Sequence, residues 1–140
     1  MGKVKLEIDY DYDFLLFGIS CHFKDYRLCW ALNRKLDLRL KKEEDLKISA
    51  QEPEKQAQFS FYTFQDDRAH LNYFVAANRG SEGYLIQEHR QVDYFMVIEG
   101  VLETLDSSEI TKKLREMEVI ITAFELDPNE LKSKQNLLFE

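Results

Sequence analysis

Apolar and acidic residues alternate near the start of the chain. Apolar side chains occupy every second position from Leu6 to Phe14, and Asp or Glu occupies each position between them. A period of two with one charged face predicts a half-buried β-strand over this range. Between Phe14 and Phe17 both faces become apolar, so we expect the strand to enter a covered part of a sheet and to loosen at Gly18.

The most continuously apolar strand-like segment extends from Val92 to Ile98 and includes one charged residue. Tyr94, Met96 and Ile98 would project from one face of a strand, and the two residues between them from the other. A strand that is apolar on both faces is typical of the interior of a sheet. We therefore expect this segment to be the central strand of the fold.

Helical periodicity first occurs between Phe23 and Leu36 and predicts an amphipathic helix there. Ser20 or Asp25 is expected to cap the free amides at its start. Tyr26 and Trp30 form a second stripe, four residues apart. The stripe that would pack on the sheet consists of Leu28, Cys29, Leu32 and Leu36.

A second helix is expected after Gly100. Asp106 is a suitable N-cap, and Glu109 three residues later completes a capping box. Residues 119–126 then return as a strand, so the segment from Tyr94 onward is strand, helix, strand. A right-handed crossover would place its two strands parallel in one sheet.

Shorter strand and loop signals lie between these elements. Leu38 to Ile48 predicts two short edge strands, or an extended arm with a charged bend. Residues 49–58 have little apolar content and predict a loop. Residues 59–65 and 70–77 are rich in aromatic side chains and predict a hairpin, and a turn or mobile loop is expected over 78–83.

Together these elements predict a single α+β domain over residues 1–140. We expect a mostly antiparallel sheet of five to seven strands with two main helices on one face. The element order resembles a ferredoxin-like split βαβ unit with an added hairpin, a topology that implies no activity. A short helical turn is expected after Asp127, and the apolar residues 137–139 should dock on the body.

A sheet with both helices on one side leaves its second face either open or covered. Aromatics are 13% of the chain, and one hypothesis is that strand faces such as Tyr62 and Phe64, or Phe95 and Val97, meet a partner, a second copy or a ligand. The alternative is that the 38–48 arm and the C-terminal segment cover that face within the monomer. The sequence leaves both open.

Charge and composition exclude some partners. With 19 basic and 26 acidic residues the net charge is -7, a field that repels nucleic acid, and the single basic candidate at Lys112, Lys113 and Arg115 lies among acidic residues. No apolar run is long enough to span a membrane. The two cysteines and the start of the sequence give no sign of secretion, so we expect a cytoplasmic protein.

Metal and cofactor signals are weak. Cys21, His22 and Cys29 include no CxxC pair, and eight residues along one helix would separate the thiols by about 12 Å, too far for a shared zinc. The alternating aspartates over 9–13 resemble the start of a calcium loop without its glycine and bidentate glutamate. No phosphate loop and no nucleophile with a paired base occurs. We expect no cofactor and no metal.

The pattern closest to a motif extends from Ile86 to Tyr94. Five residues of this segment are Ile86, Glu88, Val92, Asp93 and Tyr94. They resemble the signature of the IPExxxVDY family, small bacterial proteins seen in Bacteroidetes, and the likeness spans nearly the whole chain. Gln87 stands where that signature has proline. The resemblance implies membership and brings no activity with it.

Glu88 and Asp93 lie on either side of a predicted turn. Such a carboxylate pair can perform acid–base chemistry if one carboxyl is buried and its pKa is raised. The alternative, which we favour, is that both fix the turn by accepting hydrogen bonds from the backbone or from Arg90. His89, between charged neighbours, is expected to be exposed.

These observations favour a non-catalytic protein-binding or adaptor module, with self-association into a homodimer as one form. The partner would be an unknown protein or a second copy, and neither nucleic acid nor a membrane. The alternative is a small-molecule-sensing regulatory domain with a pocket near Glu88–Tyr94. An enzyme that uses Glu88 and Asp93 is a third hypothesis, and we expect that the protein is not an enzyme.

Overall fold

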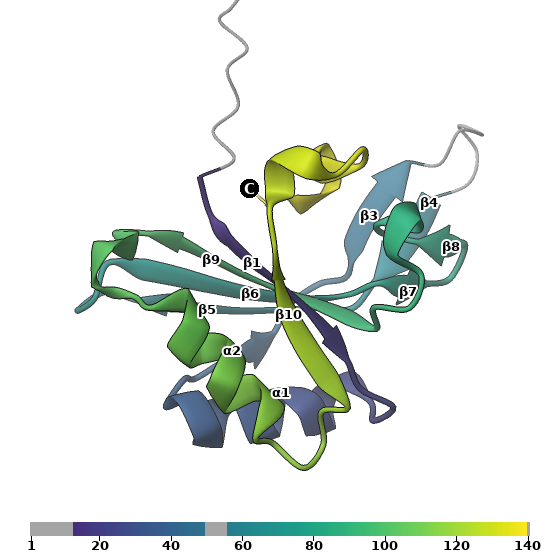
Figure 1. Cartoon of the computed structure of the whole chain (residues 1–140). Coiled ribbons are helices and arrows are strands. Elements are labelled where there is room, and N and C mark those ends of the chain that lie inside the picture. Colours follow the sequence, from purple (N-terminus) through teal and green to yellow (C-terminus); the bar gives the residue numbers. More distant parts are fainter. Residues whose placement is uncertain (1–12, 50–55, 140) are drawn as a thin grey trace, which may run out of the picture.

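The computed structural model describes residues 13–49 and 56–139. Its main feature is a six-stranded antiparallel sheet with the strand order β10-β1-β9-β6-β5-β2 (Figure 1). The sheet strands are β1 (Leu15–Ser20), β2 (Lys41–Lys42), β5 (Phe61–Asp66), β6 (Leu71–Ala77), β9 (Tyr94–Gly100) and β10 (Thr122–Leu126). The helices are α1 (Asp25–Leu36) and α2 (Ser107–Arg115). The predicted α+β class with a mostly antiparallel sheet is confirmed.

Two small hairpins complete the strands. One consists of β3 (Leu46–Ser49) and β4 (Gln56–Phe59), and the other of β7 (Arg79–Gly80) and β8 (Gly83–Tyr84). Short 3-10 helices occur at Gln87–His89, Leu102–Thr104, Pro128–Glu130 and Lys134–Leu137. These pieces lie around the sheet rather than in it (Figure 1).

The central part of the sheet consists of two interleaved βαβ units. β10 pairs with β1 and β1 pairs with β9, both antiparallel, so β9 and β10 are parallel with β1 between them. In the same way β9 lies between β1 and β6. The predicted parallel relation of the two strands around the second helix is confirmed, and the arrangement has the ferredoxin-like split topology, extended at one edge by β5 and β2.

One face of the sheet packs against both helices (Figure 1). Tyr94, Met96 and Ile98 project from β9 into this layer, as their alternation predicts. Helix α1 contributes Leu28, Cys29 and Leu32, each at most 2% exposed, and α2 contributes Leu114. Burial of such an apolar side chain stabilises the fold by roughly 1.5–3 kcal/mol.

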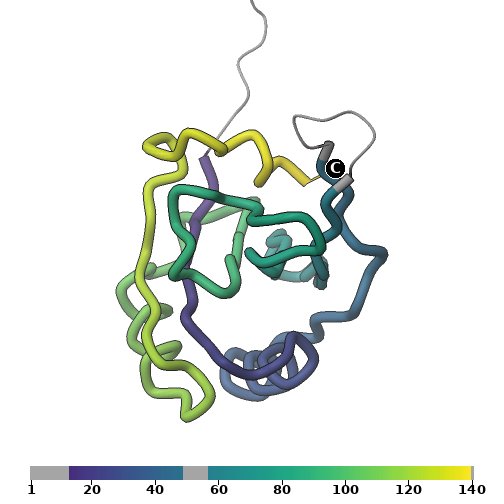
Figure 2. Tube along the Cα trace, turned by 90° about the vertical axis from the view of Figure 1, so that its right-hand side faces the viewer, coloured from purple at the N-terminus to yellow at the C-terminus, as the bar shows by residue number. Residues whose placement is uncertain are grey.

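The opposite face is covered by the chain itself. Phe95 and Val97 of β9 are fully buried there. The covering residues come from the β3–β4 hairpin, the segment after β8 and the C-terminal segment, which crosses from β10 toward that hairpin (Figure 2). The ring of Phe139 lies 4.9 Å from that of Phe61 and 5.1 Å from that of Phe74. The hypothesis of an open aromatic sheet face is therefore wrong for Phe95 and Val97.

The second proposed pair of strand residues, Tyr62 and Phe64, lies on the helix side. Tyr62 is 8% exposed and belongs to the helix-side core, and Phe64 packs against that core and stacks on Tyr73. Neither pair offers an open sheet surface. The alternative in which the 38–48 arm and the C-terminal segment cover that face is confirmed for the C-terminal segment and for Leu46 and Ile48 of β3. It is wrong for Leu38 and Leu40, which belong to the helix-side core.

Several element boundaries differ from the sequence predictions. The strand predicted over 6–14 lies outside the described residues except for its last two positions, and β1 begins at Leu15. Gly18 lies within β1 rather than at its end. A Cβ at this position would come within 3.2 Å of the Phe124 ring, so the glycine leaves room for that ring. Lys24 precedes the first helical residue and makes no side-chain cap. Of the two predicted capping residues, Asp25 is itself the first helical residue, and its carboxylate accepts from the Tyr26 N–H at 2.7 Å.

Candidate functional site

Asn78 organises the segment that contains the signature. Among the described residues it is the only buried polar side chain, at 0% exposure. Its amide nitrogen donates to the carbonyls of His89 and Val92, both at 2.8 Å, and its amide oxygen accepts from the Ile86 N–H at 2.8 Å. One side chain therefore fixes both ends of the 86–92 turn. Of the turn or mobile loop predicted over 78–83, the structure has the turn, at residues 81–82 of the β7–β8 hairpin, after the buried Asn78.

Two signature residues fasten the loop that leads into α1. The Asp93 carboxylate accepts from the Cys21 N–H at 2.8 Å, and the Tyr94 hydroxyl donates to the Phe23 carbonyl at 2.8 Å. Burial, followed by the nearby Cys21 thiol and carboxylates, raises the pKa of Tyr94, so its hydroxyl stays protonated as a donor. Asp93 and Tyr94 thus hold the start of α1 in place.

Glu88 fastens the C-terminal segment. Its two carboxylate oxygens accept from the backbone N–H and the hydroxyl of Ser133, each at 3.0 Å. The slight desolvation of this exposed carboxylate would by itself raise the pKa of Glu88, but hydrogen bonds from Ser133 and from the backbone at Glu88 and Lys132 outweigh it and lower the pKa. A general acid at neutral pH needs the opposite shift.

The remaining signature residues are core residues. Ile86 and Val92 are at most 1% exposed and lie in the cluster on the face opposite the helices. His89 is half-buried rather than exposed, and its Nδ1 has no hydrogen-bond partner among the described residues. A surface hollow of about 490 Å³ lies beside Glu88 and Arg90, near the place where the sensor hypothesis expects a pocket.

The largest exposed aromatic group lies on α1 and at Phe23, two residues before the helix begins. Phe23, Tyr26 and Trp30 are 46%, 65% and 58% exposed. The guanidinium of Arg27 lies 5.2 Å from the Phe23 ring centre, and that of Arg34 lies 4.9 Å from the Trp30 ring centre. We call these five residues the aromatic–arginine surface.

Helix geometry explains why these rings point outward. Positions three and four residues apart share one face of a helix, and this relation joins Arg27 and Arg34 to Trp30, and Tyr26 to Trp30. Phe23 precedes the helix and joins this stripe through its contact with Arg27. The buried residues of α1, Leu28, Cys29 and Leu32, lie on the other side. Large exposed rings without an apolar cover are unusual enough to indicate a contact surface.

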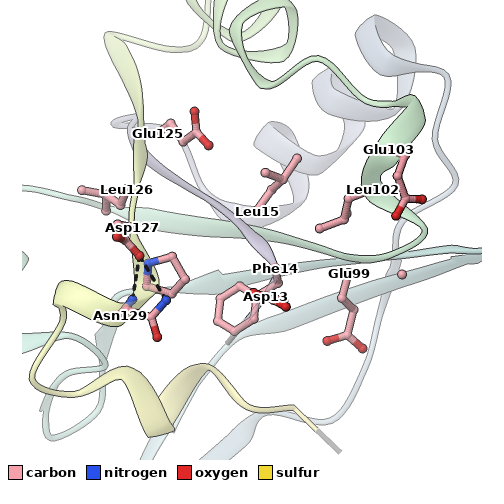
Figure 3. A pocket seen from close by; sticks show the side chains of 12 residues that line it. Asp13, Phe14, Leu15, Glu99, Leu102, Glu103, Glu125, Leu126, Asp127 and Asn129 are labelled. Carbon is pink, nitrogen blue, oxygen red and sulfur yellow. Dashed lines mark hydrogen bonds between the residues drawn. The ribbon is translucent and has the colours of Figure 1, made fainter. Parts of the chain in front are cut away.

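A separate, acidic groove of about 940 Å³ lies elsewhere on the surface (Figure 3). The carboxylates of Glu99 and Glu103 lie on the opposite side of it from Glu125 and Asp127. Burial raises the pKa of Glu99. The Asp127 carboxylate is occupied by the backbone and side-chain nitrogens of Asn129. Among the described residues no group of three or more His, Cys, Asp or Glu is arranged to hold a metal.

Comparison with known proteins adds no assignment. No protein-family model matches the chain, and no curated protein matches its sequence. The resemblance to the IPExxxVDY family stays a prediction. In the described residues no helix combines the length and the apolar character that crossing a membrane requires.

The sequence points only partly to these residues. The five signature residues are brought together around one turn and its contacts, although Glu88 and Asp93 bind different segments. The second stripe of Tyr26 and Trp30 was visible at four-residue spacing, and was the available signal for the α1 surface. Asn78 had no such signal, because its partners are 8 to 14 residues away in a turn that no periodicity reveals.

Proposed function

We propose that the protein is a non-catalytic protein-binding module that contacts its partner through the aromatic–arginine surface of α1. The observation that supports this most is the exposure of Phe23, Tyr26 and Trp30 together in a chain that covers both faces of its main sheet. Trp, Tyr and Arg are the residues most enriched among energetically dominant interface positions.

The size of the exposed aromatic area is compatible with such a role. At the quoted exposures the three rings present on the order of 300 Å². Burying that area would contribute about 7 kcal/mol before the costs of association, which are themselves about 4–15 kcal/mol. The rings alone would give weak binding, so the arginines beside them are needed for a stable complex.

The signature supports the same proposal by pre-organising the surface. Asp93 and Tyr94 hold the backbone at Cys21 and Phe23, which reduces the ordering cost when a partner binds. Their hydrogen bonds, and those of Glu88, favour structural roles for the carboxylates over acid–base catalysis. The free, buried cysteines Cys21 and Cys29 are compatible with the cytoplasm, where we place the module.

Small-molecule sensing is the second candidate, supported by the hollow beside Glu88 and Arg90. It requires a metabolite to stabilise the folded chain. A thermal-shift screen against a metabolite collection, repeated with Arg90→Ala, tests it: stabilisation lost in the variant would favour sensing over the binding module.

Comparative affinity capture tests the proposal. The wild-type chain, the double variant Tyr26→Ser/Trp30→Ser and the control Ile121→Ser are used as baits in the same lysate of the source organism. Ile121 is 60% exposed and lies outside the aromatic–arginine surface, so the control removes a comparable exposed apolar group. We expect proteins retained by the wild type and the control to be lost from the double variant. Equal retention by all three baits would contradict the proposal.

Self-association is one form of the same proposal and is tested separately. Sedimentation velocity of the wild type at micromolar concentrations measures it directly. A concentration-dependent dimer that Tyr26→Ser/Trp30→Ser abolishes would identify a second copy as the partner. A dimer that this variant leaves unchanged would place self-association elsewhere and count against the use of α1.

A further inference from the structure

The charge around the aromatic–arginine surface is opposite to that of the rest of the chain. Residues 22–42 contain seven Lys and Arg and two Asp, a net charge of +5. The other 119 residues contain 12 basic and 24 acidic residues, a net charge of -12. A basic surface in an otherwise acidic protein attracts an acidic partner to one place.

Several cations in this segment are not neutralised within the chain. Lys35 pairs with Glu116 at 3.1 Å, and Lys42 pairs with Asp25 and Asp45. Arg27 and Arg34 form no ion pair with any described residue, and both are exposed. Each lies over an aromatic ring, at 5.2 Å and 4.9 Å from the ring centres. A guanidinium in such a contact can still donate its N–H groups to a carboxylate.

We propose that the aromatic–arginine surface binds an acidic peptide segment that has an apolar side chain between two carboxylates. The inference rests on the proposed function and names the chemistry of the partner. Arg27 and Arg34 are two helical turns apart, about 10 Å along the axis, and Trp30 lies between them. Each arginine would receive a carboxylate in a two-point hydrogen-bonded pair, and the apolar side chain would lie on the indole.

The spacing of the arginines predicts the spacing of the acids. In a helical partner, residues seven apart lie about 10 Å apart on one face. The residue three or four positions after the first acid lies on the same face between the two acids. The bound segment is therefore expected to be helical, with carboxylates seven residues apart and an apolar side chain midway.

Single-stranded nucleic acid also combines charge with stacking on aromatic residues, but the surroundings favour a peptide. The basic segment is followed directly by exposed Glu43, Glu44 and Asp45, and Glu116 lies beside Lys35. A polymer with a uniform negative charge would meet these acids after a few nucleotides. A peptide can place two carboxylates at the arginines and neutral residues elsewhere.

Selection from a random 12-residue peptide library displayed on phage, with the whole wild-type chain as target, tests the inference. The enriched peptides are titrated against three chains with emission from Trp30, the only tryptophan in the sequence. The chains are the wild type, Arg27→Gln/Arg34→Gln and the control Lys112→Gln/Lys113→Gln, which removes two exposed charges on α2. A (dT)12 oligonucleotide is titrated in parallel.

We expect the enriched peptides to contain Asp or Glu at the stated spacing with an apolar residue between. Binding should weaken at least tenfold in the arginine variant, weaken with added salt, and stay unchanged in the control. Neutral or basic peptides that bind at Trp30 would overturn the inference and leave the proposed function standing. Saturable binding of (dT)12 in preference to any peptide would overturn it in favour of nucleic acid. If no enriched peptide depends on α1, and Tyr26→Ser/Trp30→Ser also leaves the proteins captured from the lysate unchanged, the acidic-peptide inference and the proposed function are both overturned.

Discussion

Replacement of Asn78 is the sharpest test of how the signature segment is held. Asn78→Ala removes three hydrogen bonds of 2.8 Å from a fully buried site. It leaves the Ile86 N–H and the carbonyls of His89 and Val92 without these partners. The backbone bonds of residue 78, from its N–H to the Asp93 carbonyl and from Leu85 to its own carbonyl, do not need the side chain.

The expected loss follows from the number of groups affected. A typical hydrogen bond contributes about 0.5–1.5 kcal/mol net, and a buried donor or acceptor left unsatisfied costs about 1–3 kcal/mol. For the groups around Asn78 we expect a loss of about 3–4 kcal/mol in the free energy of unfolding. Domains of this kind have about 5–15 kcal/mol in total, so the variant should remain folded but be clearly weakened.

Urea unfolding followed by far-UV circular dichroism measures the loss. With a slope of about 2 kcal/mol per molar urea, the midpoint should fall by roughly 2 M. Asn129→Ala, at an exposed asparagine, is the matched control and should change the midpoint little. Asn78→Asp should destabilise the fold more than Asn78→Ala at neutral pH, because a carboxylate would face two carbonyl oxygens. Part of the lost stability should return as the pH falls and the carboxyl is protonated. An Asn78→Ala midpoint within experimental error of the wild type would refute the reasoning.

Three further predictions concern single positions. Glu88→Gln should lower the free energy of unfolding by less than about 1 kcal/mol, because the carboxylate is exposed. The hydrogen bonds lower the pKa of Glu88, so the stability that its carboxylate contributes is complete above the pKa of the unfolded chain and is lost as the pH falls. The urea midpoints of variant and wild type should therefore converge in acid. Burial raises the pKa of Cys29 from 9.0 to about 12, so the melting temperature of the wild type should fall as the pH rises above about 9. The melting temperature of Cys29→Ala should fall less steeply with pH, and equal slopes for the two chains would count against a buried neutral thiol. Gly100→Ala should lower the free energy of unfolding by about 2 kcal/mol or more, because φ is +120° and a Cβ would overlap the His70 carbonyl. Gly83→Ala, at φ +110° with no atom near its Cβ, should lower it less in the same urea assay. Equal losses at the two glycines would show that the contact at His70 does not matter.

Local patterns predicted much of the fold because they depend on neighbouring residues. The alternation of Tyr94, Met96 and Ile98 gave the faces of the central strand correctly. Asp106 immediately precedes α2 and accepts a hydrogen bond from the Ser108 N–H, as its predicted N-cap position requires. The hairpin of β5 and β6 also follows from its two aromatic runs.

The errors occurred where distant segments decide the outcome. The face that includes Phe95 was treated as a possible contact surface, although Phe59 from one hairpin and Leu137 from the C-terminal segment help to cover it. No local sequence pattern indicates whether a sheet face is covered by a distant segment of the same chain or by a partner. In the same way, the 49–58 loop prediction failed at β4 because Ala57 and Gln58 pair with β3, whose partner strand could not be inferred from composition.

The same structure relates the signature to the proposed contact surface. Asp93 and Tyr94 bind the backbone at Cys21 and Phe23, both in the short connection from β1 to α1. A change in the signature would therefore affect binding through the position of Phe23. Tyr94→Phe, which removes one hydroxyl and keeps the ring, separates this effect from a loss of the core.

Hydrogen–deuterium exchange of the chain, alone and with the partner retained by the wild-type bait, tests the central claim most directly. The account predicts that bound partner slows exchange of backbone amides in residues 23–36 and leaves residues 85–94 unchanged. Slower exchange at 85–94 with no change at 23–36 would contradict it, because the signature turn rather than α1 would then be the surface that the partner contacts.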